Sequence, residues 1–249
     1  MRDKGKGENP VTKSGLDLKR IVFIGRTFEE YMAMFDLSIE ELQGQKVLDC
    51  PAGSCSFTAI GCQKGLDVTA CDIAYYHPTD ALAGKGKKDI KHVAEGMKKA
   101  EQDYVFHYFR DIDDLIRHRK RALDECTASM KTEPERYIPV ELPVLSFEDD
   151  EFDLILSAHF LFTYGDRLDL SFHLDVIEEL LRVARKEIRF FPLVDLSGNR
   201  YEHLDKIISG LREKGYRVEE IAVPYEFQKN ANAMMKIQKS KIKIDLKQR

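Results

Sequence analysis

Short apolar runs alternate along the chain with segments in which apolar residues recur every three or four positions. This pattern is typical of strands joined by helices. The final two runs follow each other without a helix between them, which favours antiparallel pairing there and parallel pairing elsewhere. The pattern predicts an α/β fold, a mostly parallel sheet with one antiparallel strand and helices on both faces. The expected strands are KVLD, VTACD, YIPVELPVLSF, FDLILSAHFLF, EIRFFPLV, YRVEEIAVPYEF and AMMKIQKSKIKI.

Before the first strand, a polar segment precedes one helix. Residues 1–24 are expected to form a flexible N-terminal segment, and residues 25–249 one domain. Thr27 and Glu30 have the spacing of a capping box at a helix start. Tyr31 then lies on the apolar face of this helix, where it belongs either to the core or, because the helix directly precedes the first strand, above a ligand.

The connection between the second and third strands is longer than one crossover helix requires. A helix is expected from about residue 87 to 101, and apolar residues between 105 and 116 repeat at helical spacing. The charges of RHRKRALDEC, which follow, are expected to point outward. We interpret residues 104–136 as an inserted helical cap beside the carboxyl ends of the strands. An ordinary crossover extended by one packed helix fits the pattern equally well.

The first strand leads into a turn of small residues, CPAGSCS, and the second strand ends in Asp72. Small residues let a ligand lie against bare backbone, and a carboxylate at this point can accept both hydroxyls of a ribose. Of the three glycines in a dinucleotide fingerprint only Gly53 is present, with Pro51 and Cys55 at the outer positions. A pyrophosphate ligand is therefore disfavoured, whereas a nucleoside without phosphates is allowed. An ordinary strand, turn and helix is the alternative.

Polar side chains follow the strand FDLILSAHFLF, which is apolar enough to be central in the sheet. Ser157, His159 and Tyr164 lie at or just beyond its carboxyl end, where open parallel sheets bind ligands. His159 and Tyr164 are the candidates for proton handling or substrate orientation. A hydrogen-bonded structural histidine is the competing interpretation of His159.

Composition limits the class of protein and of partner. The chain has 249 residues, 43% of them apolar, a net charge of −4, and no long apolar segment or N-terminal signal region. The five cysteines lack paired CxxC spacing, so we expect reduced thiols, no metal site and a cytoplasmic protein. A membrane anchor is not expected, and basic residues gather only at the two ends, so nucleic acid is not favoured as a partner.

In the succession of its motifs the chain resembles the class I S-adenosylmethionine-dependent methyltransferases. GRTFEEYMAMF and SAHFLFTYGD, in addition, resemble an uncharacterised bacterial branch of them. The resemblance implies a Rossmann-like seven-stranded sheet and S-adenosylmethionine as the cofactor. It also implies contacts of Asp49 and Gly53 with the methionine part, of Asp72 with the ribose, of Ile73 with the adenine, of Glu141 and Leu142 with the adenine edge, and of His159 with the region near the sulfonium. Pro51, Ala52, Ser157 and Tyr31 are further candidates for cofactor binding.

Three functions are compatible with these observations. The first is a methyltransferase for a small-molecule acceptor, with the cap forming the acceptor pocket and His159, assisted by Tyr164, as general base. The second is a methyltransferase that acts on RNA or protein. The third is a regulatory protein that binds S-adenosylmethionine without catalysis, an option that the departures at Pro51 and Cys55 keep open. A nicotinamide-dependent oxidoreductase ranks below these because the glycine pattern does not suit pyrophosphate.

Overall fold

The computed structural model describes residues 22–97 and 104–239. In chain order its elements are α1 (Phe28–Met34), α2 (Ile39–Leu42), β1 (Lys46–Asp49), α3 (Phe57–Gln63), β2 (Asp67–Asp72), the 3₁₀ helix η2 (Ile73–Tyr76), α4 (Thr79–Met97), α5 (Ile112–Thr132), the 3₁₀ helix η4 (Pro134–Arg136), β3 (Tyr137–Pro139), β4 (Phe152–Ala158), α6 (Leu170–Val183), β5 (Ala184–Phe191), α7 (Leu204–Glu213), β6 (Arg217–Ala222) and β7 (Ala233–Gln238).

The strands form one seven-stranded sheet in the order β3-β2-β1-β4-β5-β7-β6. All neighbours pair in parallel except β7, which is antiparallel to both β5 and β6. The predicted fold class is therefore confirmed, including the single antiparallel strand. The chain starts at β1, builds outward to β3, and then returns to place β4 on the other side of β1. The strand order thus reverses between β1 and β4, and ligands of open α/β sheets bind at such a point.

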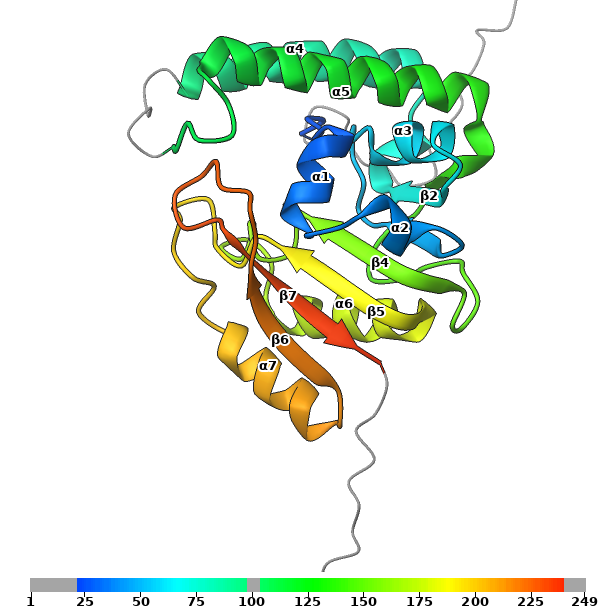
Figure 1. The fold of residues 1–249 in the computed structure, drawn as a ribbon, viewed down its shortest axis with the longest axis vertical. Helices are drawn as coiled ribbons and strands as arrows, with labels where there is room; N and C mark the ends of the chain where they lie inside the picture. Colours follow the sequence, from blue (N-terminus) through cyan, green and yellow to red (C-terminus); the bar gives the residue numbers. More distant parts are fainter. Residues whose placement is uncertain (1–21, 98–103, 240–249) are drawn as a thin grey trace, which may run out of the picture.

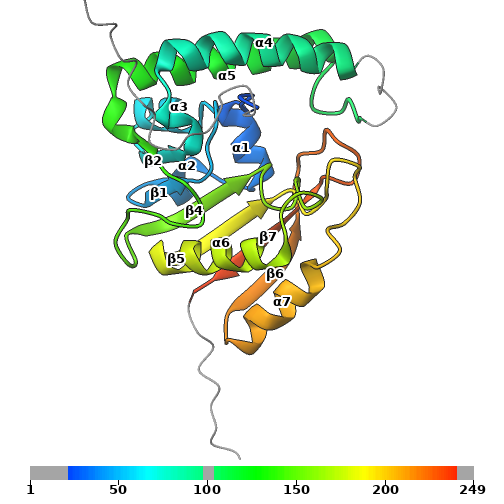
Figure 2. The ribbon, with the colours of Figure 1, turned by 180° about the vertical axis from the view of Figure 1, so that it is seen from behind.

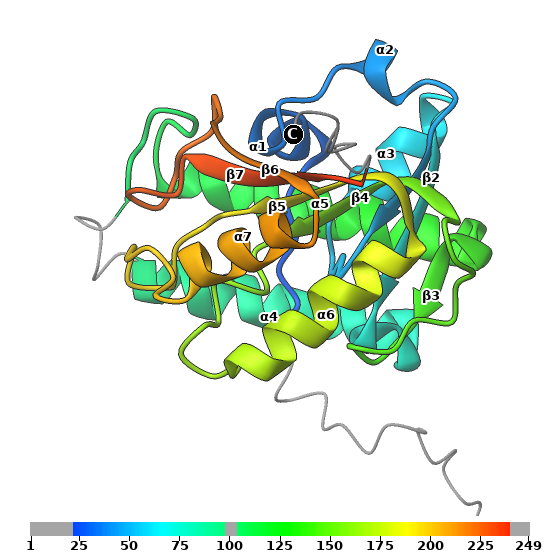
Figure 3. The same cartoon turned by 90° about the horizontal axis from the view of Figure 1, so that it is seen from below.

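Helices cover both faces of the sheet and one end of it. Figure 3 shows α6 and α7 on one side of the sheet and α1 and α2 on the other, and Figure 2 shows α6 and α7 from the front. All seven residues of β4 are buried, as expected for a central strand with both faces covered. The expected helices at α1, α6 and α7 are present, with Thr27 and Glu30 forming the predicted capping box.

Two long helices, α4 and α5, run side by side across the top of the molecule in Figure 1. Their axes approach closely at Gly86, where an added Cβ would lie 2.6 Å from Cδ1 of Leu123. Phe23 is fully buried in the same apolar cluster, and its N–H donates to Asp89 Oδ2 of α4 at 2.9 Å. The packed chain thus begins before residue 24, whereas residues 1–21 of the expected flexible segment lie outside the described residues.

The predicted boundaries of these two helices were wrong. Helix α4 begins at Thr79 rather than near residue 87, and residues 104–111 are not helical. Helix α5 begins only at Ile112, because Asp111 caps it by accepting the N–H of Asp114 at 2.7 Å. The aromatic residues that precede Asp111 pack instead against the connection between β6 and β7. There the N–H of Val105 donates to the carbonyl of Phe227 at 2.6 Å.

Candidate functional site

A cavity of about 350 Å³ opens where the strand order reverses, at the carboxyl ends of β1, β2 and β4. Helices α4 and α5 form one side of it, and the connection between β6 and β7 forms another. Its wall consists of Val22, Ile24, Arg26, Pro51, Ala52, Gly53, Cys55, Asp72, Val93, Met97, Tyr104, Arg119, Ala158, His159, Phe160, Thr163, Tyr164, Leu196, Tyr225, Phe227, Gln228 and Ala231.

The turn after β1 is fixed to the end of β2 through both polar groups of Gly53. The Gly53 N–H donates to Asp72 Oδ2 at 2.8 Å, and the Gly53 carbonyl accepts the hydroxyl of Tyr75 at 2.8 Å. Asp72 Oδ1 accepts the N–H of Ala74, also at 2.8 Å. Gly53 has a φ of +57°, a backbone region that suits glycine, and nothing lies within 4 Å of an added Cβ. The turn is therefore a fixed backbone surface that is open on its outer side.

The segment before α1 lies directly on this turn. A Cβ added to Gly25 would lie 1.9 Å from the carbonyl oxygen of Ser54, so only glycine fits there. The N–H of Arg26 donates to Sγ of Cys55 at 3.2 Å, and the N–H of Ser56 donates to the carbonyl of Arg26 at 2.9 Å. The amides at the start of α3 are thus partly covered. A phosphate would need them free, so the structure agrees with a ligand that has none.

Asp49 and Tyr31 lie one layer behind the cavity wall. Both are fully buried, and the Tyr31 hydroxyl donates to Asp49 Oδ1 at 3.0 Å, while Tyr31 stacks on Phe57 with ring centroids 5.1 Å apart. Burial raises the pKa of Asp49 to about 8, against the opposing effect of the Tyr31 hydrogen bond. Asp49 is therefore mostly protonated at neutral pH and does not contribute a full negative charge to the site.

A single buried carboxylate, that of Glu30, joins three parts of the chain beside the cavity. It accepts hydrogen bonds from the N–H of Thr27 at 3.0 Å, from Nη1 of Arg119 at 2.7 and 2.8 Å, and from the hydroxyl of Tyr225 at 2.8 Å. Burial opposes the charged form, but the charges of Arg119 and Arg26 outweigh this effect and lower the pKa of Glu30. Glu30 therefore stays ionised inside the protein.

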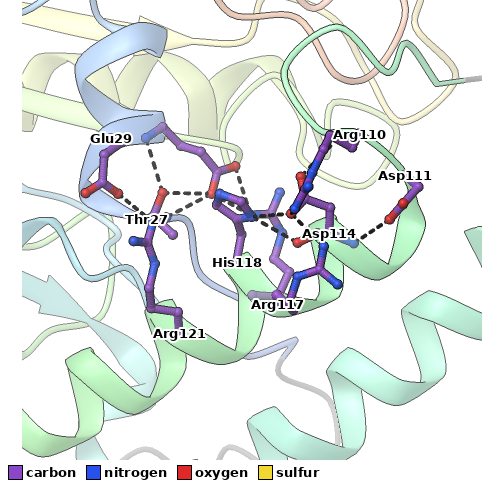
Figure 4. Close-up of polar contacts among 10 residues, drawn as sticks. Thr27, Glu29, Arg110, Asp111, Asp114, Arg117, His118 and Arg121 are labelled. Atoms are coloured by element: carbon purple, nitrogen blue, oxygen red, sulfur yellow. Dashed lines mark hydrogen bonds and ion pairs between the residues drawn. The ribbon is translucent and has the colours of Figure 1, made fainter.

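Around this buried pair, α1 and α5 are also linked at the surface. Figure 4 shows the beginning of α1 beside α5, with Thr27 and Glu29 facing Arg121 and His118. Arg121 pairs with Glu29 at 2.7 Å, and both side chains are about half exposed. Asp114, one turn into α5, accepts from Arg117 at 2.9 Å and from Arg110 at 3.4 Å. The arginines of these outer contacts are exposed, although Asp114 itself is buried, whereas both members of the Glu30 pair are buried.

Arg119 and Arg26 supply positive charge to the cavity wall, and the sequence interpretation identified neither. Arg119 is only 5% exposed, so the expectation that all charges of RHRKRALDEC point outward was wrong for this residue. Its position one turn after Leu115 places it on the buried face of α5, a signal that the helical spacing already contained. Arg26 has no ion pair with any described residue, and its Nε lacks a hydrogen-bond partner among them.

His159 lines the cavity with its backbone in the left-handed region, at a φ of +51°. Its N–H donates to the carbonyl of Phe191 at 2.6 Å, and its ring stands edge-on to the Phe191 ring at 5.5 Å. Burial first, and then the charges of Arg26 and Arg119, lower the pKa of His159 well below its usual value, so the imidazole is neutral. Strained residues of this kind often occur at functional sites. Thr163 and Tyr164 line the cavity beside it.

The structure brings six of the sequence-predicted residues together at the cavity: Pro51, Ala52, Gly53, Asp72, His159 and Tyr164. The other six do not line it, and of these Asp49 and Tyr31 lie behind its wall. Glu141 and Leu142 line a separate hollow with Tyr76 and Val144, Ile73 is half-buried in η2, and Ser157 is buried within β4.

Three further observations concern metals, thiols and membranes. Within residues 22–97 and 104–239, no group of three or more histidine, cysteine or acidic side chains is arranged to hold a metal ion. All five cysteines are free. None of the helices in this part of the chain combines the length and the apolar character needed to cross a bilayer.

Over 228 residues the chain is 37% identical to the uncharacterized protein MJ0045 of Methanocaldococcus jannaschii, a match that spans 90% of this chain and 99% of that protein. This relative is archaeal, so the predicted placement in a bacterial branch has no support. No protein-family model matches the chain.

Solved structures with a similar fold share little sequence with it. Magnesium protoporphyrin IX methyltransferase of Synechocystis PCC 6803 gives a TM-score of 0.46 at 13% identity, covering 94% of this chain and 86% of that one. A SAM-dependent methyltransferase of Aquifex aeolicus gives 0.41 at 15% identity, covering 94% and 98%. Protein PH0226 of Pyrococcus horikoshii gives 0.45 at 14% identity, covering 84% and 89%.

The Glu30→Gln variant is expected to be less stable than the wild type by about 3–5 kcal/mol, because Arg119 would remain buried without a compensating charge. Glu29→Gln is the matched control: it removes the neighbouring carboxylate of α1, whose half-exposed pair with Arg121 is worth about 0–1 kcal/mol. Urea denaturation measures both losses. Equal losses in the two variants would contradict the central role of Glu30.

Asp49 is expected to make the protein less stable as pH rises. Its folded-state pKa of about 8 lies above the ordinary aspartate value, so between the two the folded state holds a proton that the unfolded state has released. In this window the group lowers the free energy of unfolding by up to about 1.4 kcal/mol per pH unit. Asp49→Asn removes the titration, and urea unfolding from about pH 5.5 to 7.5 should show a flatter profile than the wild type. Parallel profiles would mean that the carboxyl is ionised throughout.

Proposed function

The chain belongs to the family of the uncharacterized M. jannaschii protein MJ0045, and we propose that it is an S-adenosylmethionine-dependent methyltransferase acting on a small-molecule acceptor. The observation that carries this proposal is the position of Asp72. Its buried carboxylate lies at the carboxyl end of β2, holds the turn after β1, and lines a cavity at the reversal of strand order. This is where an open α/β sheet binds the ribose of a nucleoside.

The residues around the cavity fit an adenosyl ligand without phosphates. Each Asp72 oxygen accepts one backbone N–H and keeps capacity for a ribose hydroxyl, and no cation pairs with this carboxylate among the described residues. The open side of Gly53 leaves room for the ligand to lie on the backbone. Arg26, which lies beside the turn and lacks an ion pair, would hold the carboxylate of the methionine part.

When bound, S-adenosylmethionine supplies a methyl group that its sulfonium already activates, so the protein's task is to align the acceptor in a dry site. The neutral imidazole of His159 suits the vicinity of a sulfonium, because a protonated ring would repel it. We assign His159 to orient the acceptor by hydrogen bonding and to receive its proton where the acceptor is an amine or hydroxyl. Tyr164, on the same wall, would assist it.

The shape of the site favours a small acceptor over RNA or protein. Tyr104 and Arg119 of the predicted cap, residues 104–136, line the cavity, and the net charge of the chain is −4. A positively charged surface is what nucleic-acid substrates require. We place the protein in the cytoplasm, where its five free thiols remain reduced. Binding without catalysis is the second candidate, because Pro51 and Cys55 replace glycines in the turn.

Calorimetry tests the cofactor site. We expect S-adenosylhomocysteine and S-adenosylmethionine to bind, NAD not to bind, and Asp72→Asn to weaken the adenosyl ligands at least about tenfold by removing the ribose contacts. Asp67→Asn is the control, since Asp67 is an exposed carboxylate at the other end of β2. Unchanged binding in a folded Asp72→Asn protein would exclude the proposed site.

Transfer of labelled methyl from S-adenosylmethionine to fractions of a cell extract tests the reaction. Label should enter the small-molecule fraction, and label in RNA or protein would reject the proposed acceptor class. His159→Gln is expected to slow transfer about a hundredfold or more, the usual contribution of a proton-transfer group, while S-adenosylhomocysteine still binds. His159→Asn is the second variant, because asparagine tolerates a positive φ. Full turnover in both would remove His159 from this role.

A further inference from the structure

Four polar side-chain atoms on the cavity wall have no hydrogen-bond partner within the described residues. They are Arg26 Nε, Arg119 Nη2, His159 Nε2 and Thr163 Oγ1. Arg119 and Thr163 are each only 5% exposed. A buried donor without a partner costs about 1–3 kcal/mol, so four such atoms on residues that line one cavity indicate a ligand that forms hydrogen bonds with them.

The two arginines that line the cavity differ in how their charges are compensated. Glu30 compensates the charge of Arg119 through Nη1, whereas Arg26 has no ion pair among the described residues. Asp72, the carboxylate on the wall, is held by the backbone of Gly53 and Ala74 and forms an ion pair with neither arginine. Arg26 is therefore left without a paired anion, and Arg119 keeps an unpaired Nη2 donor.

Each arginine keeps a side-chain nitrogen that needs a hydrogen-bond acceptor of its own. S-adenosylmethionine carries a single carboxylate, and Arg26 is the arginine that lies on the turn where the methionine part would bind. Arg119 projects from α5, on the side of the cavity formed by the inserted helices, and keeps Nη2 available. The acceptor for the Nη2 donor of Arg119 is therefore left to the other substrate.

We propose that the methyl acceptor carries an oxyanion, a carboxylate or a phosphate, bound by Arg119 with Thr163; this inference rests on the proposed function. The oxyanion is a recognition group and not the methylated atom, since a guanidinium hydrogen-bonded to an oxyanion withdraws its lone pairs from attack. The remaining wall is largely apolar and includes Val93, Met97, Phe160 and Phe227, together with Leu196, which is 53% exposed. The acceptor therefore combines an anionic group with an apolar body.

Simple probes test this chemistry on the full chain saturated with S-adenosylhomocysteine. We expect calorimetry to show binding of hexanoate or hexyl phosphate, with acetate weaker for lack of an apolar body and hexanamide at least about tenfold weaker for lack of charge. Whichever of hexanoate and hexyl phosphate binds more tightly identifies the oxyanion as a carboxylate or a phosphate. Hexanamide binding as tightly as both anions would overturn the proposal.

Variants locate the binding. Arg119→Lys keeps a cation beside Glu30, so the fold is retained, but it loses the free Nη2 donor, and binding of the preferred anion should fall about tenfold. Thr163→Val removes a hydroxyl without touching the ion pair and should also weaken binding. Arg121→Gln, an exposed arginine on the same helix, is the control and should bind as the wild type does. Unchanged binding in both Arg119→Lys and Thr163→Val would overturn the assignment.

Competition separates this inference from the proposed function. If S-adenosylhomocysteine binds but displaces the anion, the oxyanion site is that of the cofactor carboxylate, and only the present inference fails. If S-adenosylhomocysteine does not bind while hexanoate or hexyl phosphate still binds through Arg119, the proposed function fails and an anion site of another kind remains. Simultaneous binding of both supports the two together.

Discussion

The ion pair between Glu30 and Arg119 is the contact on which the candidate site depends. Its carboxylate accepts from α1 at Thr27, from α5 at Arg119, and from the connection between β6 and β7 at Tyr225. Two of these three residues also line the cavity. Desolvating two charges is tolerable only when nearly every polar atom is satisfied, so the pair fixes the three segments in one arrangement. The positions of Arg119 and Tyr225 on the cavity wall consequently depend on the carboxylate of Glu30.

The sheet could be predicted from the sequence because its determinants are local. Apolar runs, the capping box at Thr27 and the direct succession of the last two strands each act over a few residues, and the structure contains all of them. The region before α5 could not be predicted this way. Its aromatic residues have helical spacing, but Tyr104 stacks on Phe227, more than a hundred positions later, and this long-range contact decides the conformation.

The residues of the candidate site likewise include some that the sequence could locate and some that it could not. Gly53, Asp72 and His159 come from strand ends, which a reader of the sequence can locate, and the structure places them on one cavity. Arg119 lies in a run of charges that resembles a solvated helix face, and its partner Glu30 is 89 positions away. The helical spacing from Leu115 indicates that Arg119 is buried, but nothing in the sequence identifies Glu30 as its partner, so only the assembled fold shows this ion pair and its place beside the cavity.

Gly25 explains how a turn with one glycine can still approach a neighbouring backbone closely. A Cβ added to Gly25 would lie 1.9 Å from the carbonyl oxygen of Ser54, and Gly25 belongs to the segment that covers the turn and not to the turn itself. Close contact between two backbone segments requires a glycine in only one of them. A sequence motif restricted to the turn after β1 therefore misses this close contact, whereas a motif that also includes Gly25 would detect it.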